Sequence, residues 1–296
     1  MRHTEKLTRL PTTEIGCIIL VIVSNQVIPL SDSLAKLSSD NHSIIQVIWA
    51  RFFFYTVFTG LYLIYSNSLT SLAPSVRSVF FARGALLLAA VSLFYGSLQY
   101  LPVANALSLW FIQPFALIVL SSVICKERIH PLVWASAAIG LLGVIIANRP
   151  EIMSFHWSMM AALASGIIYA VFLLLTKRPD KAKSPMEATY QTGLVGTVIS
   201  SAVVIPFWNA PTVNEWMAFI FIGLLSAFAH FLTVVAYSNA RSSRLAPFSY
   251  TELVGAAIFG FIFFSDVPSI WTIVGLIAIA ISGMTVVLLQ ESKFSS

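Results

Sequence analysis

The sequence predicts an all-α integral membrane protein with ten transmembrane helices arranged as two inverted five-helix repeats. Three observations predict this fold. The chain is 58% hydrophobic and 10% charged, with a mean hydropathy of +0.87, whereas soluble domains carry roughly 25% charged residues. Its apolar residues form runs of about 20, the length that a helix needs to cross a bilayer core. Its basic residues lie almost entirely in every second segment between these runs, which places them on one side of the membrane.

The first five predicted spans form the N-terminal half. The first resembles a signal peptide because basic residues precede an apolar run, but the run continues without a small-residue cleavage site, so it is kept as a span. The fourth contains Gln113-Pro114, and this proline, like Pro29 in the first span, removes a backbone N–H and predicts a kink. The fifth carries Gly140 and Gly143, which permit close helix contact. These spans cover residues 14–35, 44–65, 78–98, 102–124 and 129–147.

The last five predicted spans repeat this organisation. The ninth contains Glu252 and the tenth carries Gly275 and Gly283. Since hydrocarbon offers the backbone no hydrogen-bond partner, continuous runs of this length are helices rather than the shorter, alternating strands of a barrel. These spans cover residues 157–176, 186–207, 215–237, 245–264 and 269–289.

The distribution of basic residues predicts the orientation. Of the 17 Lys and Arg residues, only Lys36 and Arg149 fall outside and Arg51 lies within a span if the N-terminus is cytoplasmic. The positive-inside rule therefore places both termini in the cytoplasm of a multi-pass protein. The inside residues are Arg2, Lys6, Arg9, Arg77, Arg83, Lys126, Arg128, Lys177, Arg178, Lys181, Lys183, Arg241, Arg244 and Lys293.

An internal repeat relates the two halves. A shift of 139 residues places Glu252 on Gln113 and Asp266 on Glu127. Because each copy has five spans, an odd number, the second copy enters the membrane in the opposite orientation, as in secondary transporters. We expect a first repeat over 1–147, an outside connecting loop at 148–156 and an inverted second repeat over 157–296.

Other classes of function are disfavoured. The net charge of +5 is scattered over short loops, so we expect topological anchoring and no nucleic-acid partner. No phosphate-binding loop, metal-ligand cluster or nucleophile elbow is present, so we predict no enzyme, no metal and no cofactor. Cys17 and Cys125 are both placed toward the cytoplasm and imply no disulfide framework.

Several segments carry a resemblance to a known family across essentially the whole chain. They are Arg51 with Phe52-Phe53-Phe54, Arg83-Gly84-Ala85, residues 94–106 (FYGSLQYLPVANA), Gln113-Pro114, Lys126-Glu127-Arg128, and Gly140 to Gly143. They closely resemble the EamA branch of the drug/metabolite transporter superfamily. The second copy departs from the family pattern at Leu253, where proline is usual, and at Asp266, where glutamate is usual.

The resemblance implies transport of a small molecule, in either direction, through a lipid bilayer. Family members move amino acids, sugars, nucleoside-like metabolites, choline, riboflavin and S-adenosylmethionine. We expect a secondary active transporter of the bacterial inner membrane that moves a small polar metabolite by alternating access. Riboflavin or a similar heteroaromatic compound is the first candidate, and an amino acid or S-adenosylmethionine is the second. A membrane receptor or scaffold that does not transport is the alternative from another class, and the oligomeric state is left open.

Three ionisable residues within spans are candidates for coupling or substrate binding, because burying a charge there costs roughly 2.5–3.5 kcal/mol. Glu252 lies about 12 Å into the ninth span, at 1.5 Å per residue, which suits proton coupling. A structural ion pair between Glu252 and Arg51 is the alternative. His230, in the eighth span, could relay a proton to Glu252 or simply pack between helices. Arg51 could bind an anionic group or serve a structural role.

Neutral side chains complete the candidate site. Trp110 lies about one turn before Gln113 and could stack on a flat ring, which favours a heteroaromatic substrate. For each residue, hydrogen bonding or packing between helices is an alternative of at least equal weight. The candidates are Gln113, Trp110, Asn25, Tyr169 and Tyr250.

Overall fold

A computed structural model describes residues 13–66, 78–101, 103–127, 129–148, 156–176 and 184–265, with part of 270–282. By contacts between Cα atoms, the chain forms two compact units. Unit 1 contains Met1–Leu88 and Leu175–Asn239, and unit 2 contains Ala89–Leu174 and Ala240–Ser296. Each unit draws on both halves of the sequence, so the units divide the chain differently from the expected repeats, whose boundaries stay a prediction.

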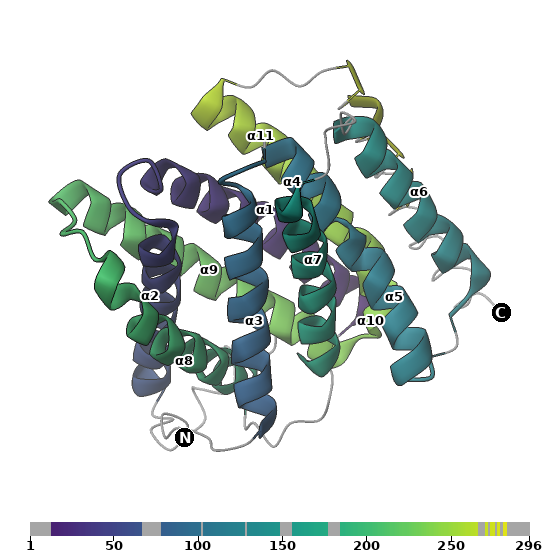
Figure 1. The fold of residues 1–296 in the computed structure, drawn as a ribbon. Coiled ribbons are helices and arrows are strands. Elements are labelled where there is room, and N and C mark those ends of the chain that lie inside the picture. The colour runs from purple at the N-terminus through teal and green to yellow at the C-terminus, as the bar shows by residue number, and fades with distance from the viewer. Residues whose placement is uncertain are drawn as a thin grey trace. The chain divides into compact units, whose positions relative to one another are not determined.

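Unit 1 is built from two pairs of consecutive helices and the first half of α3 (Figure 1). Serine and threonine side chains fix where three of the helices begin. Thr13 accepts from Gly16 N–H, Ser43 from Gln46 N–H and Ser184 from Glu187 N–H, which satisfies backbone donors that a helix start leaves open. The elements are α1 (Glu14–Ser38), α2 (Ile44–Tyr65), α3 (Ser78–Ser97), α8 (Pro185–Val204), the short 3₁₀ helix η2 (Ile205–Phe207) and α9 (Val213–Asn239).

A seam of serine hydroxyls joins α1 to α9. Ser24 Oγ donates to Ala229 O at 2.8 Å and lies 2.8 Å from Thr233 Oγ1. Seven residues later, Ser31 Oγ lies 3.0 Å from Ser226 Oγ and donates to the carbonyl of Ile222. Partner numbers on α9 fall as those on α1 rise, so the two helices are antiparallel. Such small polar residues permit close approach and supply hydrogen bonds where lipid offers none.

Glycines let the aromatic side chains of α2 pack directly against neighbouring helices. A Cβ at Gly193 would meet the ring of Tyr55, and one at Gly196 would meet the ring of Phe52. On α9, a Cβ at Gly223 would meet Phe54 Cβ and lie 2.9 Å from the Phe54 carbonyl carbon. At these three glycines, residues of α2 therefore pack directly against the backbone of α8 and α9.

Unit 2 contains the remaining helices, several of them short. The second half of α3 joins α4 (Val103–Trp110), α5 (Ile112–Ile124), α6 (Pro131–Asn148) and most of α7 (Trp157–Thr176). Close to α5 and α6 runs a 3₁₀ segment, η3. It belongs to a continuous stretch formed by α10 (Ser242–Leu245), η3 (Ala246–Thr251) and α11 (Glu252–Phe264).

Two predicted spans are not the uninterrupted α-helices that the sequence suggested. The fourth, 102–124, is split at Phe111 into α4 and α5. The ninth, 245–264, begins as a 3₁₀ helix and becomes an α-helix only at Glu252. In the fourth span, Pro114 has no N–H and its ring disrupts the turn that precedes it. In the ninth, Pro247 lies in the first turn of the 3₁₀ segment.

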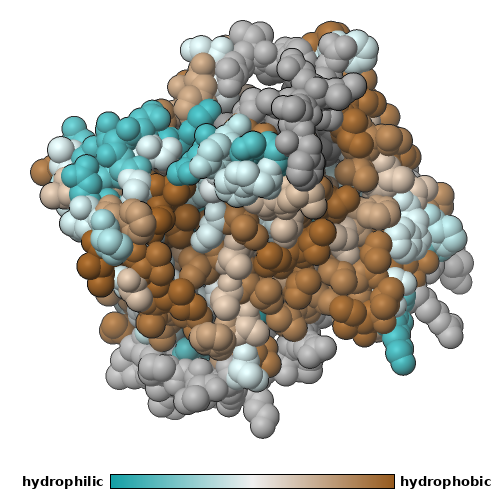
Figure 2. All heavy atoms as spheres, in the orientation of Figure 1, coloured by the Kyte–Doolittle hydropathy of each residue, from teal (hydrophilic) through white to brown (hydrophobic). Residues whose placement is uncertain are grey.

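Within the described residues, seven helical stretches are long and apolar enough to cross a membrane, and α5 and part of α6 are shorter apolar helices. The described parts of 270–282 are helical, while the rest of the predicted tenth span, the loop 149–155 and Asp266 lie outside the described residues. The count of ten spans stays a prediction. Apolar side chains cover much of the visible surface (Figure 2), as expected for a multi-pass membrane protein.

Adding a methyl group at Gly223 tests the close packing of α2 on α9. The Gly223→Ala variant should lose about 1–3 kcal/mol of stability, because the new Cβ meets main-chain atoms that cannot swing aside. Thermal unfolding in detergent measures this loss. Gly96→Ala is the matched control, since a Cβ at Gly96 in α3 meets nothing within 4 Å. Equal midpoints for the two variants would contradict the packing.

Candidate functional site

Two half-length helices begin at matching positions of the two sequence halves. α5 and α11 each contain 13 residues, and the 139-residue shift that places Glu252 on Gln113 also brings their starts to within one residue. The residues that follow them match as well. Among the described non-glycine residues, Lys126 (φ 51°) and Ser265 (φ 57°) adopt positive φ, and they are 139 positions apart. The internal repeat is therefore visible in the backbone.

The break before α5 follows from Pro114. In an unbroken helix the N–H of residue 114 would bond to the carbonyl of Trp110, but proline has no N–H and its ring crowds that carbonyl. The helix stops at Trp110 and restarts at Ile112. The Trp110 carbonyl instead faces Gly166 of α7, where a Cβ would collide with it. Gly166 thus allows α7 to lie directly against the broken turn.

The two breaks lie close together in unit 2. The ring of Phe111, at the first break, lies 6.2 Å from the ring of Tyr250, which comes just before the second. Tyr250 is fully buried, donates a 3.3 Å hydrogen bond to Ala137 O and packs on Gly140 of α6. The sequence named Tyr250 as a binding candidate, and its contacts here are those of a packing residue.

Aromatic rings and one buried amide surround the first break. Trp110 lies 5.1 Å from Tyr169 of α7 and 5.0 Å from Phe94 of α3, measured between ring centroids. Gln113 is 2% exposed, and its Nε2 has no hydrogen-bond partner among the described residues. A buried amide donor without an acceptor costs free energy, so this is a place where a ligand acceptor would be stabilising.

Glu252 is the first residue of α11 and is 9% exposed. Neither Thr251 before α11 nor Phe111 before α5 caps its helix with a side-chain hydrogen bond. The Glu252 N–H bonds to the carbonyls of Ser249 and Tyr250, so α11 continues directly from η3. The geometry therefore offers a buried carboxyl group at the change from 3₁₀ to α-helix and a buried amide near the start of α5, within one unit.

The other predicted site residues lie in unit 1. Arg51 Nη1 donates to Asp32 Oδ1 at 2.7 Å, which joins α2 to α1. His230 is buried, with its ring 5.7 Å from that of Tyr55. Asn25 is buried in α1. Sequence reasoning missed Asp32, although a buried arginine calls for an acidic partner, and Asp32 lies near the same predicted outer end.

The candidates thus fall into two sets. Trp110, Gln113, Tyr169, Tyr250 and Glu252 belong to unit 2, and Asn25, Arg51 and His230 belong to unit 1. The expected relay from His230 to Glu252, and the alternative pair of Arg51 with Glu252, join residues of different units and stay predictions. In the described part of the chain, no three His, Cys, Asp or Glu side chains are grouped as a metal site requires.

Comparison with known proteins supports a transporter. The chain is 23% identical to an S-adenosylmethionine uptake transporter of Rickettsia prowazekii over 90% of both chains. It is 23% identical to a pseudopaline exporter of Pseudomonas aeruginosa, covering 90% of this chain and 93% of that one. A riboflavin transporter of Rhizobium johnstonii is 26% identical over 60% of both chains.

The fold is also shared with a solved structure. A crystal structure of another protein matches with a TM-score of 0.80 at 17% identity, covering 93% of this chain and 98% of that chain. The EamA-like transporter family matches twice, over residues 15–149 and 156–289, so two repeats of the family pattern are present. The chain therefore belongs to the EamA-like transporter family, as its sequence motifs predicted.

Proposed function

We propose that this protein is a secondary active transporter that moves a small polar organic metabolite across the membrane by alternating access. The observation that carries the proposal is a pair of helix irregularities at matching positions, the break before α5 and the change from 3₁₀ to α-helix before α11. In secondary transporters, interrupted helices at corresponding positions of two inverted repeats form the substrate site near the bilayer midplane. Inversion of the second repeat is part of this proposal.

The substrate that best fits the first break carries a flat ring. Trp110, Tyr169 and Phe94 present aromatic surface there, and the Gln113 amide offers a buried donor to a ring acceptor. Riboflavin or a nucleoside-like compound is the first candidate, supported by the riboflavin transporter among the relatives. S-adenosylmethionine is the second, supported by the longer match to the uptake transporters. Its adenine is also a heteroaromatic ring, so the aromatic cluster suits both.

For the driving force, we propose a proton that binds at Glu252, with His230 as its relay. A carboxyl group at the start of a half-helix can exchange a proton for a cationic substrate group with small changes in structure. The relatives include both an uptake transporter and an exporter, so either direction is compatible with the fold. We place the protein in the bacterial inner membrane with both termini in the cytoplasm, because the basic residues concentrate on that side.

Replacing the carboxyl group of Glu252 tests the proposed coupling. In proteoliposomes, Glu252→Gln should reduce proton-driven uptake at least about tenfold and abolish its pH dependence, while substrate counterflow persists. Glu187→Gln is the matched control, because Glu187 also lies in the first turn of a helix, α8. An unchanged pH profile for Glu252→Gln would contradict the coupling role. No saturable exchange with riboflavin, nucleosides, amino acids or S-adenosylmethionine would favour the receptor or scaffold.

Removing the indole at position 110 tests the aromatic site. Trp110→Leu should weaken the binding of a heteroaromatic substrate about tenfold, because it loses one stacking partner worth about 1 kcal/mol or more. Competition against labelled substrate in counterflow measures the change. Trp157→Leu should leave affinity unchanged, since Trp157 is 55% exposed at the start of α7. Equal affinities for the two variants would rule out stacking at Trp110.

A further inference from the structure

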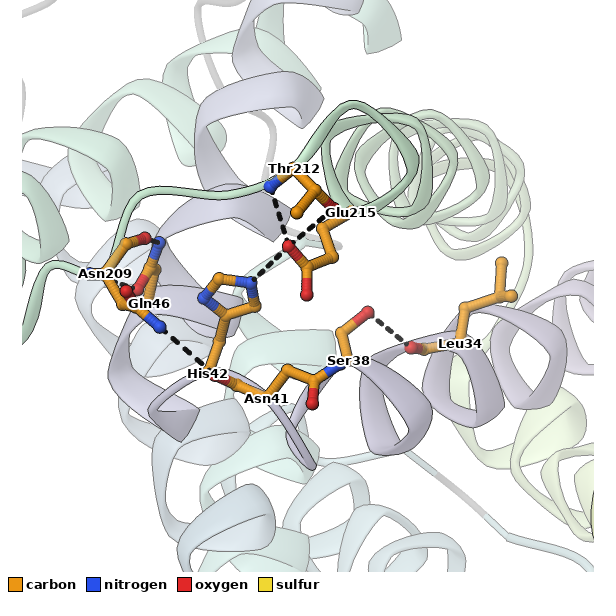
Figure 3. Close-up of polar contacts among 8 residues, drawn as sticks. All are labelled: Leu34, Ser38, Asn41, His42, Gln46, Asn209, Thr212 and Glu215. Atoms are coloured by element: carbon orange, nitrogen blue, oxygen red, sulfur yellow. Dashed lines mark hydrogen bonds and ion pairs between the residues drawn. The ribbon is translucent and has the colours of Figure 1, made fainter.

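One end of unit 1 is held together by a polar cluster between two turns. Residues 39–43 connect α1 to α2, and residues 205–212 connect α8 to α9. Gln46 Nε2 donates to Asn209 O at 2.7 Å, and Asn209 N–H returns a 3.0 Å bond to Gln46 Oε1 (Figure 3). Ser43 Oγ donates to Phe207 O at 3.3 Å. These neutral bonds hold the turns at every ordinary pH.

Within the described cluster, the contact between His42 and Glu215 contains an imidazole, which can gain or lose a proton. His42 Nε2 lies 3.3 Å from Glu215 Oε2, at the start of α9 (Figure 3). The same oxygen accepts from Thr212 N–H at 2.7 Å and from Thr212 Oγ1 at 2.8 Å. An oxygen that accepts two hydrogen bonds and lies within ion-pair distance of a ring nitrogen behaves as an ionised carboxylate. Glu215 is therefore a fixed negative charge next to the imidazole.

The surroundings of His42 make this link specific. Its side chain is 1% exposed, its ring packs edge-on at 5.2 Å from Phe219, and neither ring nitrogen has a hydrogen bond of good geometry to the described residues. The charged residues nearest to it along the surrounding elements are Glu215 on α9, Lys36 in the last turn of α1 and Asp40 in the turn. The Asp32–Arg51 ion pair and His230 lie further along α1, α2 and α9. Residues 44–50 of α2 and the connection 205–212 carry no charged residue.

We propose that His42 and Glu215 form a proton-operated latch that clamps the α1–α2 turn to the start of α9. Only the imidazolium form carries the charge that Glu215 attracts, so the latch is tight at acidic pH. It loosens as pH rises and the imidazole loses its proton. The orientation proposed for the chain places both turns on the outer face, where they would sense external acidity. The latch itself is independent of substrate and of transport.

Thermal unfolding of the full chain in detergent at pH 5.5 and pH 8 tests the latch. The pH-dependent increment is the rise in midpoint from pH 8 to pH 5.5. This increment should be about 2–4 °C larger for the wild type than for His42→Gln, because the variant keeps a side-chain donor but never gains the charge. Glu215→Gln should lose the same pH-dependent increment while retaining His42. The double variant should behave like either single variant, which shows that the two residues act as one pair.

Two controls separate the latch from general effects of pH and packing. His130→Gln removes an exposed histidine beyond α5 and should keep the full wild-type increment. Gln46→Ala removes neutral bonds of the same cluster and should lower the midpoint equally at both pH values. The proposal is overturned if His42→Gln lowers the midpoint equally at both pH values, or if Glu215→Gln leaves the increment intact.

Discussion

The demand for backbone hydrogen bonds in a hydrocarbon environment governs this structure. It makes the spans helical, and it explains why Ser24 and Ser31 of α1 donate to carbonyl groups of α9. This demand also makes an interrupted helix costly, so the irregularities before α5 and α11 need a physical explanation. At the break before α5, local packing is part of that explanation, since Gly166 lies against the carbonyl that Pro114 leaves without its helical donor. The Gln113 amide and the aromatic rings near it are the basis of the proposed substrate site.

Much of the fold could be predicted from the sequence, because hydropathy and charge are properties of whole segments. The family and the helical class were predicted correctly and are confirmed by the family match and the observed helices. The kink predicted at Pro114 corresponds to the split of α4 from α5, whereas Pro29, for which a kink was also predicted, lies inside the continuous helix α1. The 3₁₀ start of the ninth span was not predicted. The family pattern usually has a proline at position 253, where this chain has leucine, whereas the segment Ala246–Thr251 carries Pro247 in its first turn. The effect of a proline depends on its position in the helix and not on composition.

The polar partners of the site residues were harder to predict than the residues themselves. Arg51 is easily recognised as a charged residue inside a span, but its partner Asp32 lies 19 positions away on another helix. His42 and Glu215 are separated by most of the chain and lie at span ends, where charged residues are common and carry little information. Such pairs are set by how helices cross, which no short window of sequence contains. The internal shift of 139 was the exception, since it matched Gln113 with Glu252, and α5 and α11 begin at these positions to within one residue.

The spacing of the hydroxyl seam between α1 and α9 limits how these two helices can move. The bonds of Ser24 and Ser31 recur after seven residues on each helix, and Ser226 and Thr233 recur in step on the other side. Sliding one helix by a single turn would separate both hydroxyl pairs at once. The same pairing of hydroxyls would return only after a displacement of about 10 Å, the rise of seven residues. We therefore expect α1 and α9 to tilt together rather than to slide along each other.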